Sequence, residues 1–581
     1  MADIDQRQRI QTRAFYLWND RAGKAWWDPV ANWLEAEQAE HNATAQERRS
    51  AASTIPDPSK ISQIYRFRSI DALLGEYAEL DGQYVYLSSP DQLNDPMEGY
   101  QDVFWRGDSI LWENLLRHYI LALLWSTVDC LLMDASSFHC PPIAATLTED
   151  DLPTDAFRRI YHDACDDFFS NSGMPTVPIH LGSLAFPLRA DGLRLVLSTM
   201  HLVAFSSVTA AMQRARLMPN GWGEFVATAD MTRHAVDLVH ALARQAGEAP
   251  QVEIETFALA SNQLRERQTL KFLLGCGNAA TSAANQKKLY LLFSFPDAYV
   301  RGVRETLIHP PWYVSCFSSD CTDASMWASY GDQHKGAALV FRVEHDENGK
   351  PFLPLSIVTG FSASQMEPSP RFHKGRVSAT LHPVRYTNRA PEIDFFQFLG
   401  MLPRPKLQKT WHSNKNGEHS PITMSILENE ATWRERLWQS FYAMSTTKLE
   451  DWSHEAEFRV VFSDALGMRK ENRKAEYEFS QLVGVVFGLR TAINDKLRVI
   501  ELIQKKCKEA KRSDFNFYQM IYHPMKGCLF ACRTGDLTAA DIELGPVPSP
   551  PNASKPVRPG EDRSSHDEAT SNAGTVGRSA R

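Results

Sequence analysis

Hydrophobic periodicity changes twice along this chain, and this change restricts the fold more than any other feature. Short β-branched and aromatic runs at 63–68 and 83–88 have the two-residue alternation of strands. Residues 101–310 instead repeat apolar side chains every three or four positions, which predicts a long series of helices. Strand-like sequence then returns in four later segments, at 311–318, 336–343, 456–462 and 481–490. Strand-rich segments on both sides of a helical block predict an α+β fold.

The same change divides the chain into five parts. A strand-containing domain begins at 61–100 and resumes at 311–545, and residues 101–310 form an all-helical insertion between its halves. Its sheet is expected to be mixed or antiparallel. Residues 1–50 carry two amphipathic patterns that predict an N-terminal helical hairpin. Residues 546–581 contain no Leu, Ile, Met or aromatic residue, which predicts a disordered tail.

Two further segments are expected to be irregular. Residues 344–382 and 391–430 are rich in Pro, Ser, Asn and His, and they are predicted to form long loops. The second of them is interpreted as another insertion.

Composition excludes several classes of protein. The net charge of −8 gives no general attraction to nucleic acid, so nucleic-acid contact is not expected. The nine cysteines follow no paired framework and MADIDQRQR has no apolar signal core, which indicates a cytoplasmic protein with free thiols. The longest apolar run, 118–133, is shorter than the ~20 residues of a membrane span and is interpreted as a buried helix.

The first group of candidate site residues follows the first two strands. In YRFRS, alternation places Arg66 on the face opposite Tyr65 and Phe67. In LSSPDQLNDPMEG, Asn94 and Asp95 form a turn that leaves polar side chains near a strand end. A capped turn without further function explains this second motif equally well.

The second group lies at the end of the strand predicted at 311–318. Alternation places Cys316 and Ser318 on one face and Ser319 on the other. A cysteine nucleophile with His334 as its base is one hypothesis for this stretch. The spacing of Cys316 and Cys321 is not that of a zinc pair, so no metal ligands are predicted.

A short helix is predicted directly after that strand end. It begins at 323–325 and places Trp327 and Tyr330 one turn apart on its surface. His334 and Lys335 then lead into the next strand. The alternatives are that Trp327 fills the core beneath the helix and that His334 and Lys335 cap or pair at the surface.

The third group is on the strand within LEDWSHEAEFRVVF. Glu455, Glu457 and Arg459 share the face opposite the apolar side chains. They predict either a simple ion pair between Glu457 and Arg459 or a catalytic glutamate at a cleft, oriented by a basic neighbour.

Together these motifs resemble a bacterial family, domain of unknown function 2971. The resemblance rests on Y-R-F, L-S-S-P-D-Q-L-N-D-P-M-E, S-C-F-S, M-W-A-S-Y-G-D-Q-H-K-G, W-S-H-E-A-E-F-R and V-V-F-G-L-R, and it covers 61–100 and 311–520. The helical block is longer than the family would imply. Residues 8–48 are similar to another short bacterial domain of unknown function, which implies an adaptor hairpin.

The order of the motifs is also similar to that of some ADP-ribosyltransferases. Those enzymes use an Arg on an early strand to hold a phosphate of NAD, a Ser-rich strand to brace the ribose and a late Glu-x-Glu to steady an oxocarbenium-like transition state. The resemblance implies these roles for Arg66, for Ser318 with Ser319, and for Glu455 with Glu457. Trp327 or Tyr330 would stack on the nicotinamide of NAD. Ser-Ser-Asp in place of Ser-Thr-Ser and the long separations depart from that pattern.

Two other functions fit the same residues. The first is a metal-dependent nuclease or other hydrolase, with Mg²⁺ and phosphate held by Asp95, Asp332, His334, Lys335 and Glu457. The second is a non-enzymatic sensor or scaffold that binds a protein partner through the helical insertion or the N-terminal hairpin. If the protein uses NAD, a role as a toxin or an antiviral effector is the expected context.

Overall fold

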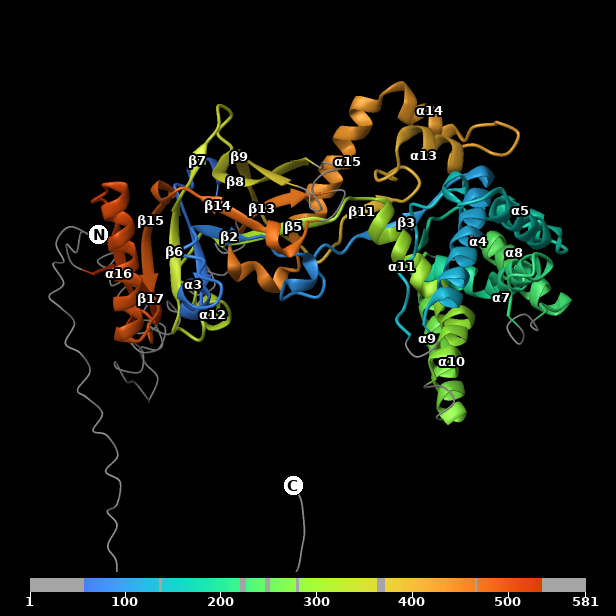
Figure 1. The fold of residues 1–581 in the computed structure, drawn as a ribbon, viewed down its shortest axis with the longest axis horizontal. Coiled ribbons are helices and arrows are strands. Elements are labelled where there is room, and N and C mark those ends of the chain that lie inside the picture. The colour runs from blue at the N-terminus through green and yellow to red at the C-terminus, as the bar shows by residue number, and fades with distance from the viewer. Residues whose placement is uncertain are drawn as a thin grey trace, which may run out of the picture.

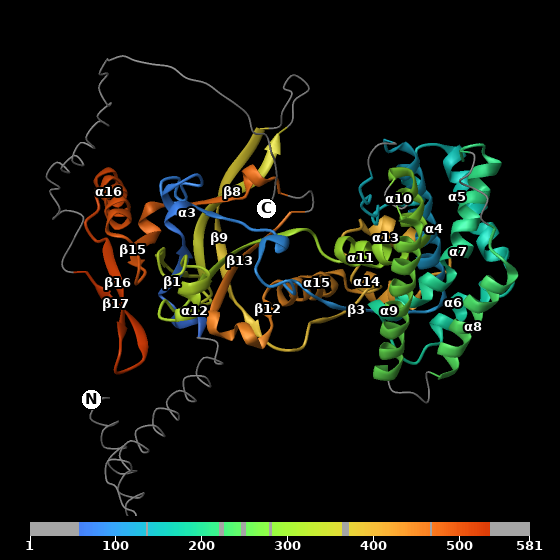
Figure 2. The same cartoon turned by 90° about the horizontal axis from the view of Figure 1, so that it is seen from below.

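The computed structural model describes residues 57–134, 138–219, 226–245, 251–277, 282–362, 371–464 and 468–534. The predicted N-terminal hairpin and C-terminal tail lie outside these ranges. The described residues form two bodies that lie side by side, a sheet body and a helical body (Figures 1 and 2). The α+β prediction is confirmed.

The sheet body is built on a mixed sheet in which β1 lies near the centre. Along the sheet the strand order is β17-β16-β15-β6-β1-β5-β13-β9-β8-β14-β2, and β7 pairs with β8. The contact between β15 and β16 is parallel and those of β1 with β5 and β6 are antiparallel. The strands are β1 (Gln63–Arg68), β2 (Tyr84–Tyr86), β5 (Trp312–Ser318), β6 (Ala337–Arg342), β7 (Glu344–His345), β8 (Pro351–Ser362), β9 (Arg371–Pro383), β13 (Glu457–Ser463), β14 (Lys474–Tyr477), β15 (Leu482–Phe487), β16 (Asn516–His523) and β17 (Cys528–Arg533).

The prediction of a loop at 344–382 is wrong, because this segment forms the long hairpin of β8 and β9. Their register runs from Phe352 opposite Thr380 to Ser362 opposite Arg371, with a shift near Gly360. Only the inner part of the hairpin is buried, and its outer part is exposed on both faces. Exposed strands need no apolar alternation, so their polar sequence resembled a loop.

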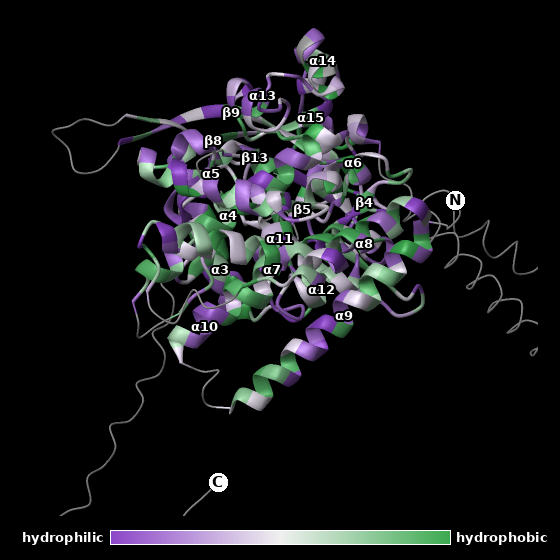
Figure 3. Cartoon of the chain, turned by 90° about the vertical axis from the view of Figure 1, so that its right-hand side faces the viewer, coloured by the Kyte–Doolittle hydropathy of each residue, from purple (hydrophilic) through white to green (hydrophobic). Residues whose placement is uncertain are grey.

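The helical body has one large apolar core, to which most of its helices contribute buried side chains. Its helices are α4 (Ser109–Leu132), α5 (Asp155–Ser170), α6 (Val177–Gly182), α7 (Ala190–Arg214), α8 (Ala229–Gln245), α9 (Gln251–Cys276), α10 (Ala283–Leu289) and α11 (Phe295–Leu307). By length and composition α4 and α7 could each cross a membrane, but 67% and 72% of their apolar windows are buried inside this body. Such burial is typical of core helices in a soluble protein. Figure 3 shows that α9 instead projects from the body with hydrophobic and hydrophilic residues mixed along it.

Residues 391–411 return from the sheet body to complete this core. β11 (Glu392–Asp394) pairs with β3 (Asp102–Trp105), which also pairs with β4 (Leu188–Arg189). Phe395, Phe396 and Trp411 are buried beside Trp105 and Trp112. The aromatic side chains of this segment explain why it packs rather than forming a free loop.

The remaining elements connect the bodies or flank the sheet. β10 and β12 form a separate parallel pair. The full set of remaining elements is α3 (Ile70–Leu74), α12 (Ala324–Ser329), β10 (Arg385–Tyr386), α13 (Arg404–Thr410), α14 (Pro421–Glu428), α15 (Glu430–Ser445), β12 (Thr447–Lys448) and α16 (Ile493–Ala510).

Candidate functional site

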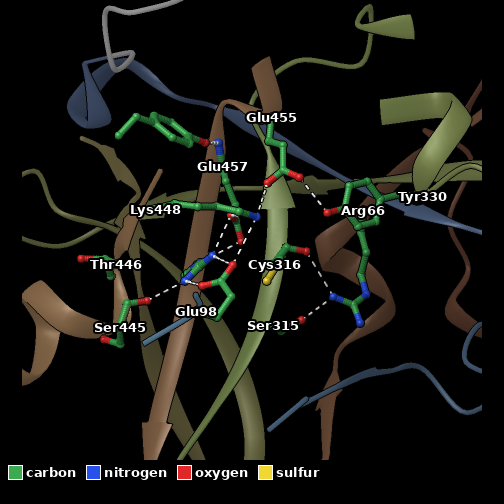
Figure 4. Close-up of polar contacts among 12 residues, drawn as sticks. Arg66, Glu98, Ser315, Cys316, Tyr330, Ser445, Thr446, Lys448, Glu455 and Glu457 are labelled. Atoms are coloured by element: carbon green, nitrogen blue, oxygen red, sulfur yellow. Dashed lines mark hydrogen bonds and ion pairs between the residues drawn. The ribbon is translucent and has the colours of Figure 1, made fainter. Parts of the chain in front are cut away.

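Three neighbouring strands of the sheet bring the candidate residues together. Ser318 at the end of β5 lies opposite Tyr65 of β1 and opposite Glu457 of β13. Directly opposed residues share a face of the sheet, so these three side chains lie in one row. Arg66 follows Tyr65 and therefore points to the other face. Figure 4 shows Arg66 on one side of β5 and Glu98 and Glu457 on the other.

A pocket opens where β1 and β5 separate. Their only direct pair is Tyr65 with Ser318, and further along β5 an isolated bridge joins Val314 to Ser88 instead. The pocket holds about 200 Å³ and is lined by Arg66, Ser318 and Glu457, among others. This volume is smaller than the roughly 300–1,000 Å³ of pockets for drug-sized ligands, so it suits one ring and its sugar rather than a whole dinucleotide. We call it the strand pocket.

The inner wall of the strand pocket is a cluster of five buried charged side chains. Glu98, Glu455 and Glu457 surround Lys448 and Arg459, and all five side chains are at most 5% exposed. We call this group the ion cluster. With three carboxylates and two cations, it carries one excess negative charge when all its members are ionised.

Arg459 organises one half of the ion cluster. Its guanidinium donates to Oε1 and Oε2 of Glu98 at 2.7 and 2.8 Å, and to Oε1 and Oε2 of Glu457 at 2.8 and 2.9 Å. It also donates to the carbonyl oxygen of Ser445 at 2.8 Å. The predicted ion pair between Glu457 and Arg459 is therefore present, but it is buried, and the same guanidinium also binds Glu98.

Lys448 organises the other half. Its Nζ lies 2.7 Å from Oε2 of Glu455, 3.2 Å from Oε1 of Glu98 and 3.7 Å from Oε2 of Glu457. It also lies 4.6 Å from the ring centre of Trp452. Lys448 thus contacts all three carboxylates of the cluster.

The two candidate catalytic glutamates have different proton affinities. Burial would raise the pKa of Glu457, but the charge and hydrogen bonds of Arg459, with Lys448, lower it to about 2. Burial and the charge of Glu457 raise the pKa of Glu455, which Lys448 opposes. One site thus holds a carboxylate that stays ionised and a second that binds a proton more readily, an arrangement typical of acid–base chemistry.

A tight turn fixes the relative positions of these glutamates. Glu455 ends a 3₁₀ helix, and Ala456 has a left-handed backbone with φ of 44°. The Ser318 hydroxyl lies 2.8 Å from the carbonyl oxygen of Glu455, and the Ser319 hydroxyl donates to that of Ala456 at 3.1 Å. Both serines therefore hold this turn in place, and Ser319 does not line the strand pocket.

Other polar groups of the strand pocket contact the same residues. The Tyr330 hydroxyl donates to Oε1 of Glu455 at 2.7 Å. Burial and then the charge of Glu457 raise the pKa of Cys316, so its thiol is protonated. The ionisable neighbour of Cys316 is Glu457. His334 is instead stacked on Trp327. The exposed Asn94 lies at the rim.

Arg66 forms the opposite wall. Its guanidinium donates to the Ser315 hydroxyl and to the carbonyl oxygen of Cys316, the latter at 3.2 Å. Its Nε has no hydrogen-bond partner among the described residues, and the nearest carboxylate oxygen, of Glu79, is 4.0 Å away. Burial lowers the pKa of Arg66 to about 10, which still leaves it charged at neutral pH.

The placement of Trp327 on the surface of α12 is wrong. Its side chain is fully buried, donates from Nε1 to the carbonyl oxygen of Cys321 at 2.8 Å and meets Phe67 edge-to-face at 4.9 Å. It does not line the strand pocket, so the alternative of a core residue beneath the helix is confirmed.

The G-D-Q-H-K-G segment that follows contacts the rest of the sheet body through its backbone. Three consecutive residues, 332–334, have left-handed conformations, and the carbonyl oxygen of His334 accepts from the amide of Arg490 at 2.8 Å. A Cβ on Gly488 would lie 2.3 Å from this oxygen, so the chains meet too closely for any side chain there. His334 and the exposed Lys335 do not line the strand pocket.

The residues of the magnesium hypothesis are not brought together. Glu457 alone of the five lines the strand pocket. Asp95 is buried and accepts from the amide of Met97 at 2.9 Å, whereas Asp332 is exposed. Within the described ranges, no group of three or more His, Cys, Asp or Glu side chains is placed to hold a metal ion.

Two members of the ion cluster, Glu98 and Lys448, have no sequence signal that predicts their place in a site. Glu98 ends the N-D-P-M-E motif, whose residue types predict only a turn. Lys448 follows the end of α15 and belongs to no motif. Its spacing of seven residues from Glu455 carries no information without the turn between them.

Comparison with known proteins supports only part of the expected resemblance. Residues 326–460 match the family model described as Protein of unknown function (DUF2971). No curated protein and no solved structure matches this chain. The matched segment contains β6, β8, β9 and most of β13, including Glu455, Glu457 and Arg459.

Proposed function

We propose that the strand pocket binds the nicotinamide riboside half of NAD, and that the protein cleaves the bond between nicotinamide and ribose. The ribosyl group passes to an acceptor or to water, as in an ADP-ribosyltransferase or an NAD hydrolase. The observation that carries this proposal is the row of Tyr65, Ser318 and Glu457 across β1, β5 and β13, with Arg66 lining the same pocket from the other face of the sheet. Arg66, Ser318 and Glu457, which follow the Arg–Ser–Glu order noted in the sequence, all line this pocket.

The ion cluster supplies suitable electrostatics for this reaction. When the C–N bond breaks, its electron pair leaves with neutral nicotinamide and positive charge develops on the ribose. The ionised carboxylate of Glu457 stabilises that charge, because Arg459 holds it in a fixed orientation. A C–O bond to the incoming hydroxyl or water then forms, and Glu455 accepts the proton that is released.

The serines have a different role from the one implied by the transferase pattern. Their hydroxyls hold the carbonyl oxygens of Glu455 and Ala456 and are not free for a ribose. In this proposal Ser318 and Ser319 are positioning residues for the two glutamates. Arg66 lines the strand pocket and stays charged, and in this proposal its charge attracts a phosphate of the ligand.

The proposal includes the extent of the family region and the biological context. β1 and β15 flank β6 in one sheet, which supports extending the matched region to 61–100 and 311–520. All nine cysteines are free, which supports a cytoplasmic location. Cleavage of NAD would suit a toxin or an antiviral effector.

The test is release of nicotinamide from NAD by the purified full-length protein. We expect Glu457→Gln to slow release by at least a hundredfold and Arg66→Lys to weaken NAD binding. Glu478→Gln is the matched control, because Glu478 is an exposed glutamate paired with an exposed arginine. Circular dichroism and urea unfolding confirm that each variant is folded. A wild-type protein that neither binds nor cleaves NAD would exclude the proposal.

A further inference from the structure

A second and larger cavity lies where the sheet body meets the helical body. It holds about 740 Å³, which is within the range of small-molecule sites. Arg304 of α11 lines it from the helical body, and Trp312 of β5 lines it from the sheet body. We call it the interbody cleft. Gln92 and Glu98 line both this cleft and the strand pocket, so the two cavities adjoin.

Three cations at the wall of the interbody cleft have no carboxylate partner among the described residues. Arg473 donates to the carbonyl oxygen of Met468 at 3.0 Å and to the Ser89 hydroxyl at 3.1 Å, both neutral acceptors. Arg304 lies over the ring of Tyr100, and Lys470 is exposed. By contrast, both cations of the ion cluster are fully paired. The interbody cleft therefore offers positive charge that a ligand can neutralise.

Aromatic rings stand beside these cations. Tyr100 is 42% exposed, so its ring is accessible to a ligand in the cleft. Trp312 is held in place by Gly99, whose φ is 70° and where a Cβ would lie 2.8 Å from the indole ring. Trp312 is itself buried, so the exposed ring of Tyr100 is the surface that a planar group can stack on.

The floor of the cleft contains an unsatisfied buried group. His309 is only 5% exposed, and its Nε2 lies 3.1 Å from the Ser440 hydroxyl. Its Nδ1 has no hydrogen-bond partner among the described residues. Burial lowers the pKa of His309 to about 4, so the ring is neutral and Nδ1 can pair with a polar ligand atom.

Acidic residues limit the charge of the ligand. Asp91 and Glu305 are exposed and also line the cleft, whereas Glu98 is occupied by Arg459 and Lys448. Two free carboxylates beside three free cations do not attract a long polyanion such as nucleic acid. They are compatible with a single phosphate.

We propose that the interbody cleft is a second ligand site, which binds a mononucleotide-like ligand with an aromatic base and one phosphate. Arg304 and Arg473 bind the phosphate, the base lies against the exposed ring of Tyr100, and His309 accepts or donates one hydrogen bond. This proposal does not depend on cleavage of NAD in the strand pocket.

The experiment is calorimetric titration of the full-length protein with the four 5′-ribonucleoside monophosphates and with inorganic phosphate. We expect at least one nucleotide to bind more tightly than phosphate alone. Arg304→Gln and Tyr100→Ala should each weaken binding of that nucleotide at least tenfold. Arg301→Gln is the matched control, because Arg301 lies one turn earlier on α11 and does not line the cleft.

Three outcomes would overturn the proposal. They are no nucleotide binding by the wild-type protein, binding that Arg304→Gln and Tyr100→Ala leave unchanged, and binding lost equally in Arg301→Gln. Loss of binding in Arg66→Lys alone would place the nucleotide in the strand pocket instead, and so would also contradict it. Unchanged urea unfolding of Arg304→Gln and Tyr100→Ala shows that the comparison is made between folded proteins.

Discussion

Arg459 and Glu98 form a doubly hydrogen-bonded pair in the interior of the sheet body, although 361 residues separate them in the sequence. The pair joins the turn after β2 to the centre of β13. Glu457 binds the same guanidinium. Arg459 therefore sets the position of Glu457, a candidate catalytic residue, and of Glu98, which lines both cavities. The ion cluster is thus a structural element as well as a candidate site.

Replacing Arg459 by Met should strongly destabilise the protein. The change leaves three buried carboxylates with a single cation, and breaking one side of a buried ion pair costs about 3–5 kcal/mol. Urea unfolding measures the loss. Arg376→Gln, which removes an exposed pair with Glu478, should change stability by less than about 0.5 kcal/mol. Equal effects of the two variants would contradict the burial of the cluster.

Replacing Tyr330 by Phe should raise the pKa of Glu455 further. The hydroxyl stabilises the charged carboxylate at 2.7 Å, and a hydrogen bond to a charged group contributes about 1.5 kcal/mol, or about one pH unit. If Glu455 is the base in NAD cleavage, the acidic limb of the rate–pH profile moves to higher pH by about that amount. Tyr522→Phe, at an exposed tyrosine of β16 that does not line the strand pocket, should leave the profile in place. An unmoved profile in Tyr330→Phe would argue against this role.

Replacing Gly488 by Ala should be far more harmful than its size suggests. The new methyl group would lie 2.3 Å from the carbonyl oxygen of His334, and a backbone oxygen cannot move aside cheaply. We expect a loss of roughly 2–4 kcal/mol in the free energy of unfolding. Gly360→Ala is the matched control, because nothing lies within 4 Å of its added Cβ. A mild effect at Gly488 would mean that the turn at 332–334 can shift.

Acid should destabilise the helical body before it protonates Glu457. Burial lowers the pKa of His118 and of His201 to about 4, below the ordinary 6.5. Between pH 6.5 and about 4 the unfolded chain binds protons that the folded chain does not, so stability falls as pH falls. Each histidine lowers the free energy of unfolding by up to about 3 kcal/mol over this window. For Glu457 the corresponding window lies lower, from 4.5 to about 2, with the same sign.

Urea unfolding at a series of pH values, followed by helix content, tests this order. His201→Gln should flatten the dependence between pH 6.5 and 4, whereas His234→Gln, at an exposed position, should not. A wild-type protein whose stability is constant over that window would contradict the burial of neutral histidines.

The strands of the sheet were largely predictable because their own residues carry the alternation. β1 lies at the predicted 63–68, and β5 is one residue shorter than predicted. The hairpin of β8 and β9 was missed because its exposed part is held by pairing between the two strands, which a local pattern does not reveal.

The candidate site was half predictable for a related reason. Arg66, Glu455, Glu457 and Arg459 lie on or beside strands with clear patterns, so their faces could be inferred. Lys448 could not be inferred, since only the close approach of segments fixed by tertiary contacts gives it partners. His334 was a candidate base because of its imidazole ring. The motif around it instead makes backbone hydrogen bonds.

The central place of β1 has a consequence for synthesis on the ribosome. Both neighbours of β1 lie far downstream: Ser315, which binds Arg66, is 249 residues later, and β6 is later still. At about 5–20 residues per second, β1 waits roughly 12–50 seconds without a partner. Most of the helical body emerges during that interval and can begin to pack first. The nascent chain therefore exposes an unpaired strand with apolar residues on one face for much of its synthesis, and chaperones are expected to bind it.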